Sequence, residues 1–171
     1  MRTFDSMKEF KAYADKIATK YKFIISKYNE DYSIDVDCHI SFHSMEDLTE
    51  LPIRFNIVSG DFSCSRSGLT SLEGSPKYVE GSFWCHDMLQ LKSLKGSPEY
   101  VKVSYDCDSN DLTSLEGCPK YVGYNFRCCD NNLQSLKGAP EFIGGEWNIE
   151  SIFKSFPEYQ RYLLVKKIEK L

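Results

Sequence analysis

The sequence has 171 residues, of which 42% are hydrophobic and 14% aromatic, and it carries a formal net charge of −4. This length fits one domain with an ample core, and the acidic balance argues against a general binder of nucleic acid or of anionic membranes. No apolar signal-peptide segment follows Met1 and no stretch approaches membrane-spanning length, so we expect a cytoplasmic protein without a membrane contact.

Residues 1–33 are predicted to form an N-terminal cap. Ser6 and Glu9 have the spacing of a capping box, which places the start of a helix that runs to Tyr21. Its apolar stripe contains Phe4, Met7, Phe10, Ala14, Ile17 and Tyr21. A basic amphipathic helix could dock on a membrane or a partner, but a cover for the first coil of a repeat array is the simpler interpretation. Two strands, at residues 23–26 and 32–37, are expected to follow.

Residues 34–152 contain one motif that recurs about every 21 residues, a period typical of solenoids. The motif reads Leu-x-Ser-Leu-x-Gly-x-Pro and begins at Leu69, Leu91, Leu112 and Leu133. Between its copies an aromatic residue precedes a cysteine by two positions, in Phe62/Cys64, Phe83/Cys85, Tyr105/Cys107 and Phe126/Cys128, with Trp147/Ile149 as a variant.

Residues two apart in an extended chain point to the same side, so each aromatic and cysteine pair predicts one strand with a buried face. The two leucines suit a tight helical turn or an irregular arc, and the glycine and proline after them stop any longer helix. Residues 39–43 read as a degenerate first copy. Six parallel strands are therefore expected, centred near residues 41, 63, 84, 106, 127 and 148.

Four of the seven cysteines, namely Cys64, Cys85, Cys107 and Cys128, share one repeat position. We interpret them as reduced core residues. A metal site or a disulfide is the alternative, but the column lacks the close paired spacing of zinc ligands and the total is odd. Cys129 is the one cysteine expected to face solvent, and no metal or cofactor is expected.

Residues 153–171 are predicted to form a C-terminal helical cap. Ser155 and Glu158 make a second capping box, with Pro157 in the first turn. The apolar positions of this helix are Tyr159, Leu163, Leu164, Ile168 and Leu171. Its terminal lysines are most simply a solvated face, and a docking site for an acidic partner is the weaker interpretation.

Within each repeat the order of the recurring positions resembles that of leucine-rich repeats. Phe126, Cys128, Asn131, Leu133 and Leu136 follow the family skeleton, as do the equivalent residues from Tyr105 to Leu115. The chain departs from it in three places: Ser67 replaces the asparagine, residues 86–91 hold one extra residue, and the upstream valine lies four residues before the aromatic. The resemblance, to short solenoids of bacteria and their large phages, covers about residues 34–150. It implies an α/β repeat solenoid with a parallel sheet, which is a binding scaffold rather than a chemistry.

Function is therefore sought on the outward side of the strands, where the residue type changes from repeat to repeat. Alternation places outward His39, Ser41, His43, Asp61, Ser63, Ser65, Ser82, Trp84, His86, Ser104, Asp106, Asp108, Asn125, Arg127, Cys129, Glu146, Asn148 and Glu150. Trp84 and Arg127 are typical interface anchors. The predicted partner-binding residues are Trp84, His86, Asp106, Asp108, Arg127, His43, Asn125 and Asn148.

The sequence thus favours a non-enzymatic protein-binding module, and the resemblance to phage proteins suggests an inhibitor that occludes a host defence protein. The first alternative is a small-molecule or nucleotide binder that uses the same histidine, aspartate and tryptophan positions. A second is a merely solvated sheet face. Catalysis by His43 or His86 with Asp61, Asp106 or Asp108 lacks any supporting motif, and a flat face excludes water poorly. Open sheet edges would favour a homo-oligomer.

Overall fold

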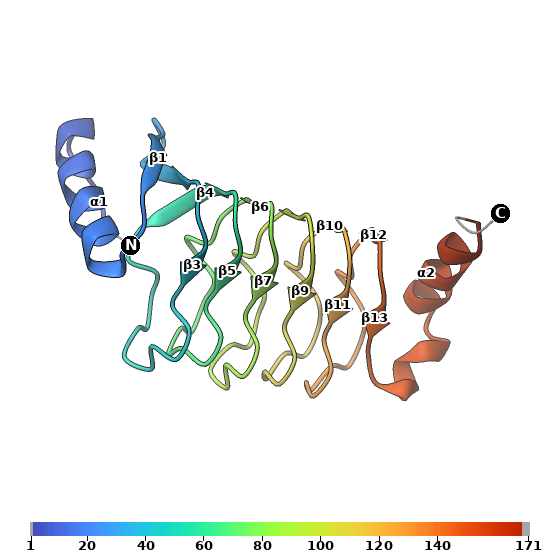
Figure 1. The fold of residues 1–171 in the computed structure, drawn as a ribbon. Coiled ribbons are helices and arrows are strands. Elements are labelled where there is room, and N and C mark those ends of the chain that lie inside the picture. The colour runs from blue at the N-terminus through green and yellow to red at the C-terminus, as the bar shows by residue number, and fades with distance from the viewer. Residues whose placement is uncertain (1, 169–171) are drawn as a thin grey trace.

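The computed structural model describes residues 2–168, which wind into a solenoid of parallel β-strands between two terminal helices (Figure 1). The elements are α1 Met7–Tyr21, β1 Ile25–Tyr28, β2 Ser33–Val36, β3 Ile40–Ser41, β4 Arg54–Val58, β5 Phe62–Ser63, β6 Tyr78–Val79, β7 Phe83–Trp84, β8 Tyr100–Val101, β9 Tyr105–Asp106, β10 Tyr121–Val122, β11 Phe126–Arg127, β12 Phe142–Ile143, β13 Trp147–Asn148, the 3₁₀ helix η1 Ser151–Ser155 and α2 Pro157–Ile168.

Each coil contributes two short strands, so the solenoid has two sheets. Sheet A has the order β1-β2-β4-β6-β8-β10-β12, and sheet B has the order β3-β5-β7-β9-β11-β13. All neighbours pair in parallel except β1 and β2, which form an antiparallel hairpin. The six predicted strands are confirmed as those of sheet B. The two strands predicted at residues 23–26 and 32–37 correspond to β1 and β2 of sheet A, but its strands from β4 onwards were not predicted.

The return path between the sheets is an irregular arc without a helix in the described coils. Two leucines enter the interior, and a glycine at positive φ then turns the chain, as at Gly117 with φ 91°. A proline follows two residues later. This leaves no length for a helix, and the Tyr-Val pairs that come next have high β-propensity. Among residues 2–168 the α-helices therefore lie at the two ends of the solenoid.

The interior holds the predicted columns of aromatic and cysteine side chains. The rings of Phe62 and Phe83 stack with centroids 5.3 Å apart and planes 3° apart, and those of Phe83 and Tyr105 with 5.4 Å and 4°. Cys64 and its three column partners are buried. All seven cysteines are free thiols, but Cys38 and Cys118 are partly exposed as well as Cys129, so the expectation of a single solvent-facing cysteine was too narrow.

The two helices cover the ends of the solenoid. The Ser6 hydroxyl accepts a hydrogen bond from the Glu9 amide at 3.2 Å, which confirms the predicted start of α1, and Phe10, Ala14 and Ala18 are buried on its inner side. Helix α2 begins at Pro157, after η1, which was not predicted. Neither helix in the described part of the chain has the length and apolar character needed to cross a membrane.

The inward side of α2 matches the prediction at Tyr159 but differs from it at the leucine positions. Tyr159 and Tyr162 pack their rings against Trp147, while Leu163, Leu164 and Ile168 are exposed. The two tyrosines contact the last coil through Trp147, and the Tyr162 hydroxyl also donates to the Gly145 carbonyl. With the tyrosines facing inward, the predicted leucine positions face outward. Leu171, also predicted to lie on the apolar face, lies outside the described residues.

A tight corner leads from sheet B into each arc. The corner residues Ser44, Arg66, Asp87, Ser109 and Asp130 have φ values between 53° and 58°. The residue after the corner closes it from inside. Asn110 accepts a hydrogen bond from the Met88 amide and donates to the carbonyls of Cys85 and Cys107, and Ser67 at the equivalent position donates to the Cys64 carbonyl. The serine thus retains one of the contacts of the asparagine that it replaces.

Candidate functional site

The outward side of sheet B carries three parallel columns of side chains. The middle column follows the strand register and contains Ser41, Ser63, Trp84, Asp106, Arg127 and Asn148. Trp84 is half-buried, whereas Arg127 is 52% exposed. Asp106 lies between them in register, so Trp84 and Arg127 are about 10 Å apart on one rigid surface.

The column that precedes each strand has a structural role. The side chains of Asp61, Ser82, Ser104 and Asn125 each accept a hydrogen bond from the backbone amide of the equivalent residue in the next coil, at distances from 2.7 to 3.4 Å. This ladder holds the coils in register. Asn125, one of the predicted partner-binding residues, therefore has its side-chain oxygen committed to the Glu146 amide.

The column that follows each strand repeats this arrangement in part. The Ser65 hydroxyl accepts from the His86 amide at 3.2 Å, and Asp108 Oδ1 accepts from the Cys129 amide at 2.6 Å. His43, at the first position of this column, is exposed. The outward side thus combines structural polar groups with a smaller set of side chains that stay accessible.

A compact charge cluster forms where the middle and following columns meet. Arg127 Nε lies 2.9 Å from Asp108 Oδ2 and 3.4 Å from Asp106 Oδ2, and the two carboxylates are only 14% and 16% exposed. Burial raises the pKa of Asp106, although its hydrogen bond from the Asp108 amide works in the opposite direction. The hydrogen bond to Asp108 raises the pKa of Arg127. Two largely buried carboxylates therefore orient a guanidinium that remains partly exposed to solvent.

A second cluster occupies the neighbouring corner. His86 Nδ1 and Arg66 Nε both contact Asp87 Oδ2, at 3.0 and 3.2 Å, and the pKa of Asp87 is lowered, first by the His86 hydrogen bond and then by Arg66. Asp61 pairs with His39 at 3.0 Å. In the described chain His86 therefore binds its sequence neighbour, and none of the predicted base and acid combinations forms a hydrogen bond. Cys129 is also a poor nucleophile at neutral pH, because burial and Asp108 raise its pKa to about 11.

The sequence reasoning missed an aromatic column on the outer side of sheet A. Tyr100 stacks on Tyr121 with centroids 4.6 Å apart, and Tyr121 stacks on Phe142 at 4.8 Å, with planes within 10°. The available signal was the aromatic residue that precedes a valine or isoleucine in four successive coils, from Tyr78–Val79 to Phe142–Ile143. Because the rings cover one another's faces, this column offers ring edges rather than faces to a ligand.

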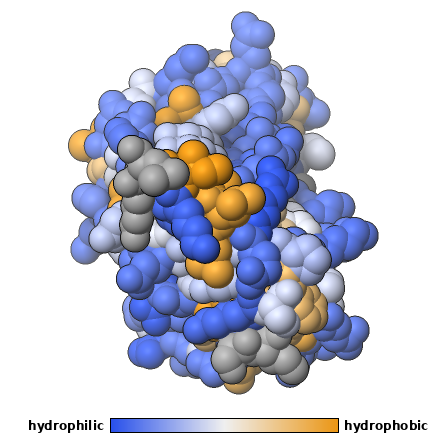
Figure 2. All heavy atoms as spheres, turned by 90° about the vertical axis from the view of Figure 1, so that its right-hand side faces the viewer, coloured by the Kyte–Doolittle hydropathy of each residue, from blue (hydrophilic) through white to orange (hydrophobic). Residues whose placement is uncertain are grey.

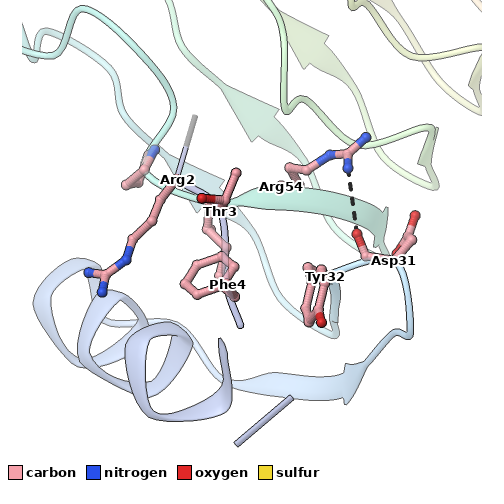
Figure 3. A pocket seen from close by; sticks show the side chains of 8 residues that line it. Arg2, Thr3, Phe4, Asp31, Tyr32 and Arg54 are labelled. Atoms are coloured by element: carbon pink, nitrogen blue, oxygen red, sulfur yellow. Dashed lines mark hydrogen bonds between the residues drawn. The ribbon is translucent and has the colours of Figure 1, made fainter. Parts of the chain in front are cut away.

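Two cavities that the sequence did not indicate lie at the ends of the solenoid. The N-terminal cavity has a volume of about 370 Å³ and is lined by Phe4, Tyr32 and Pro52, with Arg2 and Arg54 at its sides (Figure 3). Both arginines already have partners: Arg2 pairs with Glu9, and Arg54 donates to the Asp31 carbonyl. The C-terminal cavity, of about 260 Å³, lies between the last coil and α2.

The described residues contain no cluster of three or more histidine, cysteine, aspartate or glutamate side chains placed to hold a metal ion. Comparisons of the chain with protein-family models, curated proteins and solved structures give no match.

Proposed function

We propose that this protein is a non-enzymatic binding module that holds another protein against the outward side of sheet B. One observation carries the proposal: Trp84 and Arg127 stand on the same column of a hydrogen-bonded sheet, on either side of Asp106. Tryptophan and arginine are the residue types that most often dominate binding energy at protein interfaces. The middle column is also the part of this side least used by the inter-coil hydrogen bonds.

Preorganisation supports the same assignment. Asp106 and Asp108 fix the Arg127 side chain before any partner arrives, which lowers the conformational entropy lost on binding. A partner that places a carboxylate or carbonyl over the outer edge of Arg127 and an apolar residue over Trp84 would match this surface. His86 and His43 lie at the margin of the same surface, and Asn148 extends the middle column.

The proposal includes a family and a biological role. The hydrogen bonds that the side-chain amides of Asn110 and Asn131 donate to backbone carbonyls at the corners support a leucine-rich-repeat-like class for the coils. The resemblance to short phage solenoids supports an inhibitor that occludes a host protein in the cytoplasm.

Affinity purification of the tagged protein from a bacterial lysate, with quantitative mass spectrometry, tests the proposal. The informative variant is Trp84→Ala/Arg127→Gln, and the control Val103→Ala/Tyr124→Ala alters exposed residues outside sheet B. We expect one protein to be enriched by the wild type and the control, with a loss of about 30-fold or more for the first variant. The proposed surface would be refuted if the Trp84→Ala/Arg127→Gln variant enriched the partner as well as the control variant does. It would also be refuted if the wild type enriched no protein.

The small-molecule alternative is favoured by one observation, the aromatic N-terminal cavity, rather than by the predicted histidine and aspartate positions. A ligand there would raise the melting temperature, and the effect would be reduced by Arg54→Gln.

A further inference from the structure

The C-terminal end of sheet A presents hydrogen-bond acceptors. Along this sheet the backbone amides of each coil donate hydrogen bonds to carbonyls of the preceding coil. The Gly123 amide donates to the Val101 carbonyl, and the Gly144 amide donates to the Val122 carbonyl, both at 2.9 Å. The carbonyls of a coil therefore point towards the coil that follows. Strand β12 is the last strand of the sheet, so its carbonyls point beyond the repeats.

Helix α2 satisfies one part of this edge. The Tyr162 hydroxyl donates to the Gly145 carbonyl at 2.7 Å and accepts from the Trp147 amide at 3.2 Å, and Lys166 donates to the Gly144 carbonyl. No described residue donates to the carbonyls of Glu141 and Ile143. Their equivalents in the preceding coil, Lys120 and Val122, both accept such bonds. Within residues 2–168 the cap thus leaves two acceptors without a donor, two residues apart on one edge.

The C-terminal cavity lies beside these two carbonyls. Its apolar lining comes from Pro140, Phe142 and Ile143 in the last coil and from Val165 in α2, and its volume of about 260 Å³ is suited to one large side chain. Charged side chains of both signs stand at its margin, namely Lys137, Glu141, Glu158 and Arg161.

Helix α2 itself is incompletely covered. None of its described side chains is buried, and Leu164, Val165 and Ile168 are 59%, 37% and 62% exposed. Figure 2 shows apolar surface in the centre of this end of the molecule. An occupant of the cavity would cover Val165 and Phe142.

We propose that the groove between β12 and α2 binds an extended peptide segment of a partner protein, which adds to sheet A as a parallel strand. Two carbonyls at alternate residues require two N–H donors with the same spacing, and an extended polypeptide backbone supplies them. The segment carries an apolar side chain that enters the cavity. This site is separate from the outward side of sheet B and does not depend on the function proposed for it.

A random peptide library displayed on phage tests the proposal with the full-length protein. The variant Val165→Trp fills the groove, and Leu164→Trp is the matched control, because Leu164 is exposed on the same helix but does not line the cavity. Circular dichroism and the melting temperature establish that both variants are folded. We expect selected peptides to share one apolar position and to bind the wild type and the control equally, with a loss of about tenfold or more on Val165→Trp.

A scan of the best peptide by single N-methylation tests the hydrogen bonds without altering the protein. Methylation at two alternate residues should abolish binding, and methylation between them should not. Equal binding to Val165→Trp, or a scan without this alternation, would overturn the proposal. Concentration-dependent association of the protein alone that is lost in Val165→Trp would assign the groove to a second copy and overturn the partner peptide.

Discussion

Replacing Asn110 by alanine should destabilise the solenoid strongly, because this side chain makes three hydrogen bonds in a buried corner. Its oxygen accepts from the Met88 amide at 2.8 Å, and its amide group donates to the carbonyls of Cys85 and Cys107 at 2.8 and 2.9 Å. In Asn110→Ala the Cys107 carbonyl would keep its hydrogen bond from Asn131. The Met88 amide and the Cys85 carbonyl would lose the partner that they have in the described structure.

Each orphaned buried group costs about 1 to 1.5 kcal/mol and the third bond somewhat less, so we expect a loss of about 3 kcal/mol. For a chain of this size that corresponds to a fall of roughly 6 to 12 °C in melting temperature. Asn132→Ala is the matched control, since Asn132 is exposed and its side chain bonds to Asp111 at the surface. This variant should change stability by less than about 0.5 kcal/mol.

Equilibrium urea unfolding followed by circular dichroism measures both variants. Asn110→Ser should fall between Asn110→Ala and the wild type, because Ser67 makes one equivalent bond in its own coil. If Asn110→Ala cost no more than Asn132→Ala, the corner hydrogen bonds would not hold the coils together as argued.

Three further changes test other parts of the fold. Ser44→Gly should stabilise the protein by roughly 1 kcal/mol in urea unfolding, because Ser44 has φ 58° and glycine adopts a positive φ without steric strain. The control Ser26→Gly, in the extended strand β1, should destabilise the protein. Two effects of the same sign would contradict the idea that backbone strain at Ser44 lowers stability. Tyr162→Phe removes the hydroxyl between Gly145 and Trp147, so it should cost about 1 to 2 kcal/mol more than Tyr159→Phe and speed hydrogen exchange at the Trp147 amide. Because burial raises the pKa of Asp106, its stabilising protonated form is present at low pH and is lost as the pH rises through the folded-state pKa. The free energy of unfolding of Asp106→Asn should therefore be at least that of the wild type at pH 7, and equal to it below about pH 4. If the variant were less stable than the wild type at pH 7 but equal to it at low pH, the ion pair with Arg127 would outweigh the cost of burying the carboxylate.

Much of the fold could be predicted because it rests on local, repeated signals. The spacing of Phe83 and Cys85 placed a strand, the period placed its neighbours, and Ser6 with Glu9 placed the start of α1. The strands of sheet A contain only two residues in most coils, as in Tyr78–Val79, which is too short for alternation to be read. The return path then depended on Gly117 and its equivalents, which exclude a helix without specifying a strand.

The site was harder to predict because outward residues serve two purposes. Alternation placed Asp61, Asn125 and Arg127 on the same side. The hydrogen bonds of the folded chain are what separate the inter-coil ladder from the accessible middle column. The pairing of His86 with Asp87 depends on the corner at positive φ, which no pattern of residue types indicated. The end cavities arise from how α1 and α2 dock, and docking angles are not encoded in a repeat.

Hydroxyl-radical footprinting of the complex with the enriched partner tests the central claim most directly. If sheet B holds the partner, oxidation of Trp84 should fall markedly on binding, while oxidation of Tyr124, which is exposed outside that sheet, and of Leu164 on α2 should stay unchanged. Protection of Tyr124 or Leu164 without protection of Trp84 would contradict the account.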